Sequence, residues 1–69
     1  MTQKELLYLE DAIGHEKNII KICEDIVKNL DDQNLVTFIE NEISIHTNTK
    51  DNLINTLEVK SNEWSSSYG

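Results

Sequence analysis

Apolar residues recur along the first half of the chain at alternating steps of three and four residues. They define a first stripe, made of Leu6, Leu9, Ile13, Glu16, Ile20, Cys23, Val27 and Leu30. Such steps keep every member on one side of an α-helix and form the heptad pattern of packed helices. The stripe predicts one amphipathic helix over about residues 3–30, with Glu16 at a position where an apolar residue is expected.

A second stripe with the same spacing follows a polar break at residues 29–34. Its members are Val36, Ile39, Ile43, His46, Lys50, Leu53 and Leu57. It predicts a second helix over about residues 33–62, and so short a connection returns that helix antiparallel to the first. The expected fold is therefore all-α, with a helical hairpin over residues 1–64 and a disordered polar tail over residues 65–69.

Local signals support both helix starts. Thr2 and Glu5 have the spacing of a capping box, in which each side chain bonds a backbone amide of the other residue. Asp31 or Asp32 can cap the second helix, because a carboxylate accepts bonds from the first free amides. Gly14 interrupts the first helix at a cost of about 1 kcal/mol relative to Ala. We expect it to mark a close approach of another helix, the alternative being that it has no specific role.

The small size of the chain bears on its assembly. Its 69 residues allow one domain, and so short a chain buries a marginal share of its surface. Cys23 is the single cysteine, so an intrachain disulfide is impossible. Ile19, Ile22 and Phe38 lie beside the two stripes and widen the apolar surface. We therefore expect a homodimer in which two hairpins form a four-helix bundle.

The charge balance excludes some partners. The chain carries thirteen acidic residues against six basic ones, for a net charge of −7. A protein that binds nucleic acid or an anionic membrane needs clustered Lys and Arg on its surface, so neither is an expected partner. The sequence also has no apolar run of the roughly 20 residues that a membrane span needs and no signal-peptide core. We expect a cytoplasmic protein with a reduced thiol at Cys23.

Three polar residues are predicted to meet near the middle of the hairpin. Glu16 and His46 each lie some fifteen residues from the bend and occupy inward stripe positions, and Glu42 lies one helical turn before His46. A buried carboxylate needs a partner. The three residues can form a structural polar layer, bind a divalent metal such as iron, manganese or zinc, or face a solvated centre without a specific role.

One stretch resembles a known family. Residues 5–17, Glu-Leu-Leu-Tyr-Leu-Glu-Asp-Ala-Ile-Gly-His-Glu-Lys, precede a long helix with a central His, as in the small coat-F-type spore coat proteins of endospore-forming bacteria. The resemblance covers about residues 2–60. It implies a ferritin-like four-helix fold, a structural role in the spore coat and other coat proteins as partners. Ferritin-like metal sites combine a Glu with Glu-x-x-His on the next helix. Glu16 and His46 match these positions but Ile43 replaces the second Glu, which implies the fold without oxidase chemistry.

The sequence favours a non-enzymatic function. It contains no Gly-rich phosphate loop, Cys-x-x-Cys pair or serine-nucleophile motif, and no catalytic or cofactor-binding residues are predicted. We expect a self-associating structural protein associated with the spore. One alternative is a ferritin-like metal-binding protein that uses Glu16, Glu42 and His46. A second alternative is an acidic adaptor that docks a basic protein partner. The role of the Ser-rich end with Tyr68 is left open.

Overall fold

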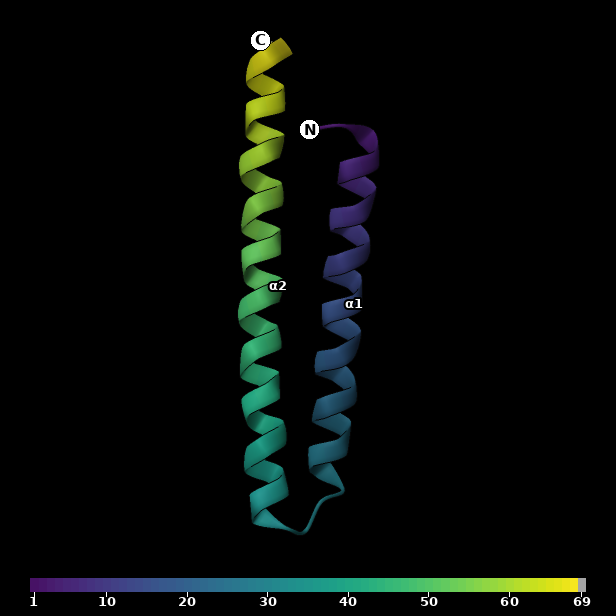
Figure 1. Ribbon diagram of the computed structural model, residues 1–69, viewed down its shortest axis with the longest axis vertical. Coiled ribbons are helices and arrows are strands. Elements are labelled where there is room, and N and C mark those ends of the chain that lie inside the picture. Colours follow the sequence, from purple (N-terminus) through teal and green to yellow (C-terminus); the bar gives the residue numbers. More distant parts are fainter. Residues whose placement is uncertain (69) are drawn as a thin grey trace.

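The computed structural model describes the backbone of residues 1–68 and the side chains of residues 1–62. It contains two α-helices in a hairpin, α1 (Gln3–Lys28) and α2 (Gln33–Tyr68), which pack against each other along their length (Figure 1). Over the described residues the chain is all-helical, as predicted. The hairpin is a long rod of 55 × 16 × 12 Å, one helix pair thick.

The start of α1 has the predicted capping box. The amide of Thr2 donates to the Glu5 carboxylate at 2.8 Å, and the amide of Glu5 donates to the Thr2 hydroxyl at 3.1 Å. These two bonds satisfy amides that have no partner within the helix. They also lower the pKa of the Glu5 carboxyl, because its bond from the Thr2 amide stabilises the charged form, and the Thr2 side chain adds to this effect.

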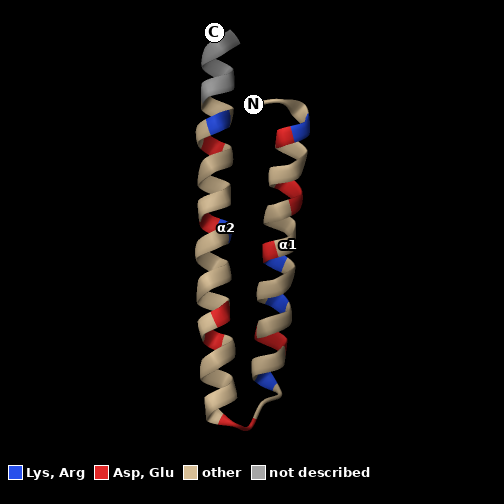
Figure 2. Ribbon diagram, in the orientation of Figure 1, with Lys and Arg blue, Asp and Glu red and all other residues tan. Residues whose placement is uncertain are grey.

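The turn between the helices is short and polar, and Figure 2 places acidic residues in it. Asn29 ends α1, where its side-chain amide donates to the carbonyl of Asp25 at 2.9 Å. Asp32 begins α2, because its Oδ1 accepts from the amides of Asn34 at 2.8 Å and Leu35 at 3.3 Å. Of the two aspartates that the sequence offered as caps, Asp32 therefore takes the role.

Two boundaries differ from the sequence prediction. Helix α1 ends at Lys28 instead of about residue 30, and α2 continues to Tyr68 instead of ending near residue 62. Helix α2 therefore extends past the start of α1 (Figure 1). The backbone of residues 65–68 belongs to α2, whereas the sequence suggested a disordered tail. The side chains from residue 63 onward, and Gly69, lie outside the described residues.

Both stripes face the interior of the hairpin. Every member of the two stripes is at least partly buried, while most of the residues that lie between stripe members along the sequence are exposed. Among the described residues, however, Ile13 alone is buried, at 8% exposure. Cys23 is partly buried, so its expected place on the stripe is confirmed but its burial is incomplete. Two helices supply one shared contact surface, which is too little to enclose a core.

Within the hairpin, Gly14 does not mark a close approach. A Cβ placed at this residue would meet nothing within 4 Å, so α2 does not come close to it. Gly14 is not a member of the first stripe, and its neighbour Ile13 makes the inward contact instead.

Candidate functional site

The site lies near the middle of the hairpin and is built by both helices. Glu16 belongs to the first stripe of α1 and His46 to the second stripe of α2, so helical periodicity directs both side chains inward. The antiparallel return then brings their levels together. Glu42 precedes His46 by four residues and stacks on the same side of α2.

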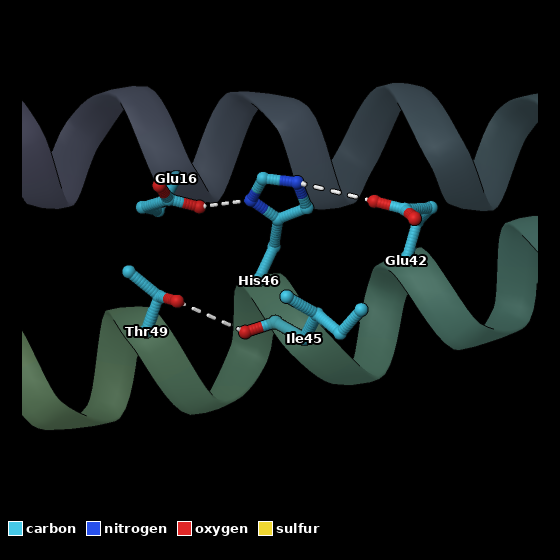
Figure 3. A network of polar contacts seen from close by, with 5 residues as sticks. All are labelled: Glu16, Glu42, Ile45, His46 and Thr49. Carbon is cyan, nitrogen blue, oxygen red and sulfur yellow. Dashed lines mark hydrogen bonds and ion pairs between the residues drawn. The ribbon is translucent and has the colours of Figure 1, made fainter.

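The structure brings together all three residues that the sequence singled out. The Nδ1 of His46 is hydrogen-bonded to the Oε2 of Glu16 across the two helices, and Figure 3 shows the imidazole lying between the two carboxylates. On the other side of the ring, the Nε2 of His46 lies 3.7 Å from the Oε2 of Glu42. The predicted pairing of Glu16 with His46 is therefore observed directly.

Burial decreases across the site. The side chain of Glu16 is 16% exposed, that of His46 26% and that of Glu42 37%. A partly buried carboxylate is costly without a donor, and the His46 imidazole supplies that donor to Glu16. Glu42 has enough solvent contact to remain hydrated. Glu16 and His46 are therefore the structural pair, and Glu42 is a solvated outer member.

The protonation form of His46 controls how many of these contacts it can satisfy. A neutral imidazole donates from one nitrogen, whereas an imidazolium donates from both. The bond to Glu16 requires a proton on Nδ1, because an ionised carboxylate only accepts. Attraction between Nε2 and Glu42 then requires the second proton. The neutral form satisfies the cross-helix bond, and the charged form adds the contact within α2.

The three polar side chains of the site are not gathered around one point. The carboxylates of Glu16 and Glu42 lie at opposite nitrogens of the His46 imidazole. No single point is therefore close to both carboxylates and to one ring nitrogen. Among the described residues, no group of three His, Cys, Asp or Glu side chains is arranged to hold a metal. Ile43 takes an inward position of the stripe and offers no ligand.

Two threonine hydroxyls on α2 form hydrogen bonds within their own helix, which reduces the polarity of the α2 surface. The hydroxyl of Thr49 donates to the carbonyl of Ile45 at 3.1 Å (Figure 3), and the hydroxyl of Thr56 donates to the carbonyl of Asn52 at 2.8 Å. Each threonine thus bonds its own helix four residues back. Their hydroxyls are satisfied internally.

The structure also contains a surface that the sequence analysis recognised only in part. Eight large apolar side chains are 39% to 61% exposed, and all except Leu7 fall at the heptad positions that flank the two stripes on one side. We call these seven the apolar face: Tyr8, Ile22, Ile26, Leu35, Phe38, Ile45 and Val59. Ile22 and Phe38 were expected beside the stripes. The signal for the other residues is a second three-and-four spacing, which is obscured by polar members such as His15 and Asn52.

Both helices contribute to the same side. Both helices are right-handed, but the chain runs along them in opposite directions. Viewed from one end, successive residues therefore turn clockwise along one helix and counterclockwise along the other. Residues that flank the two stripes at equivalent heptad positions therefore meet on one side. One shallow hollow is accordingly lined by Glu5 and Tyr8 of α1 together with Thr56 and Lys60 of α2. Glu42 occupies the same side of α2 as Thr56, two heptads earlier, so the polar site borders the apolar face.

Comparison with protein-family models, curated proteins and solved structures finds no match to this chain. The resemblance to coat-F-type proteins therefore stays a prediction from the sequence. The fold defines the class of the molecule as an all-α helical hairpin. Neither helix, over the described residues, is long and apolar enough to cross a membrane.

Proposed function

We propose that the chain is a non-enzymatic, self-associating structural protein whose working form is a dimer of hairpins in a four-helix bundle. The observation that carries the proposal is the imbalance between the buried and exposed apolar side chains. Among the described residues one apolar residue, Ile13, is buried, while seven large ones remain exposed on the apolar face. Large apolar side chains exposed on one side of a small protein are typical of an interaction surface.

The Glu16–His46 pair supports a structural role. A polar pair within an apolar seam favours the register in which both groups find partners, since a shift by one turn would strand the carboxylate. The hydrogen bond of the pair joins α1 to α2, and the second imidazole nitrogen is directed at Glu42. Its geometry supports alignment of the hairpin more than chemistry on a bound substrate.

Sedimentation tests the self-association. At tens of micromolar, the protein is expected to sediment with about twice its chain mass of 8.0 kDa. A stable monomer at that concentration contradicts the proposal.

The proposed location is the spore coat, and it is supported by the resemblance of residues 2–60. Other coat proteins are the proposed further partners. An antibody raised against the purified chain is expected to detect it in spore-coat extracts of the source organism and not in vegetative cells. Detection in vegetative cells alone contradicts the location and leaves the self-association intact.

A further inference from the structure

We propose that the apolar face binds a second copy of this chain with the two interhelical turns at the same end of the bundle. This inference rests on the proposed self-association and adds which surface is used and in which orientation. The argument uses three properties of the face: its charge, its satisfied polar groups and the distribution of its large side chains.

The charge distribution permits two acidic chains to meet here. The face follows two flanking stripes, which take every third and fourth residue from Glu5 to Asn29 on α1 and from Leu35 to Val59 on α2. Within these stripes Glu5 and Glu42 are the acidic residues, and none of the six lysines falls among them. The opposite side of the hairpin carries many charges, including Lys17, Lys21, Glu24, Glu40, Asp51 and Glu58. Depletion of charge is the composition of an interface core.

The threonine hydroxyls within the face add little to the cost of covering it. The hydroxyls of Thr49 and Thr56 donate to carbonyls of their own helix, so they need no acceptor from a covering chain. The site residue that borders the face, His46, already has a carboxylate at each ring nitrogen. A covering chain therefore buries apolar surface without separating these groups from their partners.

A second copy fits the face better than an unrelated partner. Among the described residues the isolated hairpin buries Ile13 alone, so a folded chain is expected to gain stability from a cover. A second copy is always available at the concentration of the chain itself. It also matches the length of the rod and the weak charge of the surface, because a two-fold interface places the same face on both partners.

The uneven distribution of large apolar side chains decides the orientation. Near the turn the face carries Ile22, Ile26, Leu35, Phe38 and Ile45. Toward the other end it carries Tyr8 and Val59, separated by polar residues such as His15 and Asn52. A two-fold axis parallel to the helices lays the apolar halves on each other. An axis perpendicular to the helices would set each apolar half against the polar half of its partner.

Matched substitutions test which face is used. Ile22 and Leu7 are both on α1 and are 57% and 53% exposed, but Leu7 lies away from the apolar face. Ile22→Lys is expected to shift the sedimenting species at tens of micromolar from dimer to monomer, whereas Leu7→Lys is expected to stay dimeric. Retention of the dimer by both variants, or its loss in both, overturns the assignment of the interface.

Distance measurement tests the orientation in a protein that still dimerises. A nitroxide label at Asp31→Cys, in a Cys23→Ser background, marks the exposed turn. With the turns together, pulsed electron resonance is expected to give a label separation of about 20–30 Å, the width of stacked helices plus linkers. A separation of about 40 Å, near the length of α1, overturns the orientation but not the self-association. If the unlabelled wild type is a monomer, both the orientation and the self-association are overturned.

Discussion

Glu16 and His46 show how a single polar pair can be placed in an apolar seam. Both residues stand at stripe positions where heptad packing favours Leu, and their hydrogen bond joins α1 to α2. Neither is fully buried, at 16% and 26% exposure, so the penalty of desolvation is smaller than for an enclosed ion pair. The pair can therefore be removed as a unit more safely than either member can be removed alone.

Replacement of the pair tests this view. His46→Leu is expected to lower the free energy of unfolding by about 1–3 kcal/mol, because it leaves Glu16 partly buried without its donor. Glu16→Leu is expected to cost less, since His46 retains Glu42 at 3.7 Å. The double Leu variant is expected to match or exceed the wild type, with a gain of up to about 4 kcal/mol. Urea unfolding followed by circular dichroism measures all three variants against the wild type.

Two outcomes would contradict that ordering. If the three variants unfold like the wild type, the pair makes no difference to the packed state. If added iron, manganese or zinc raises the melting temperature of the wild type but not of Glu16→Leu, the site binds metal and the alternative function is correct. We expect no metal effect, because the carboxylates of Glu16 and Glu42 lie at different nitrogens of the ring.

Gly14 offers a second test at the residue scale. Because a Cβ at this position meets nothing within 4 Å, Gly14→Ala should remove the conformational cost of glycine without a clash. The free energy of unfolding per chain is expected to rise by about 0.5–1 kcal/mol, as measured by urea unfolding. A clear loss of stability would mean that another chain approaches α1 at Gly14, away from the apolar face, and would oppose the proposed interface.

The two helices differ in how their ends are secured. Helix α1 has a reciprocal capping box at its start and a side-chain bond from Asn29 near its end. Helix α2 starts with the single carboxylate of Asp32, which accepts from two amides. These local bonds define where the turn begins and ends, and they thereby set the register that aligns Glu16 with His46.

The capping box predicts a pH dependence. The pKa of the Glu5 carboxyl is lowered in the folded chain, chiefly by its bond from the Thr2 amide. The contribution of the charged Glu5 carboxylate to the stability of the fold is therefore fully present above the unfolded pKa of about 4.3. It is lost as the pH falls through the lower folded pKa. Glu5→Ala is expected to melt below the wild type at about pH 7, and the difference should shrink at about pH 3.

Thermal melts of the two proteins in parallel measure that difference, since subtraction removes the effect of all other carboxyls. Glu5→Gln is the matched control, because glutamine keeps a capping-box acceptor without the charge. A difference between Glu5→Ala and the wild type that is equal at both pH values would show that the charge of Glu5 contributes nothing.

On the scale of the whole molecule, a rod with one buried residue among those described is expected to depend on association. If folding and dimerisation are coupled, stability follows mass action. A tenfold rise in protein concentration is worth about 1.4 kcal/mol, and the melting temperature should rise by about 3–7 °C. Calorimetry over a hundredfold concentration range measures the slope. A melting temperature independent of concentration would indicate a hairpin that is stable by itself.

The sequence alone determined the features that depend on helical period and local bonding. The three-and-four spacing placed every stripe member inward, and the spacing of Thr2 and Glu5 specified the cap. It also brought Glu16 level with His46, because counting residues from the bend fixes a level to within about one turn. These predictions succeed because each depends on residues close in sequence or on the count along a regular helix.

Only the tertiary structure decided the features that depend on what lies opposite. It showed that Gly14 has open space beside it, that His46 directs its second nitrogen at Glu42, and that Cys23 is partly exposed. It also showed that the flanking stripes of both helices join into one apolar face. Distances between side chains and the depth of burial depend on how the two helices are rotated about their axes. The spacing of apolar residues along either helix alone does not specify that rotation.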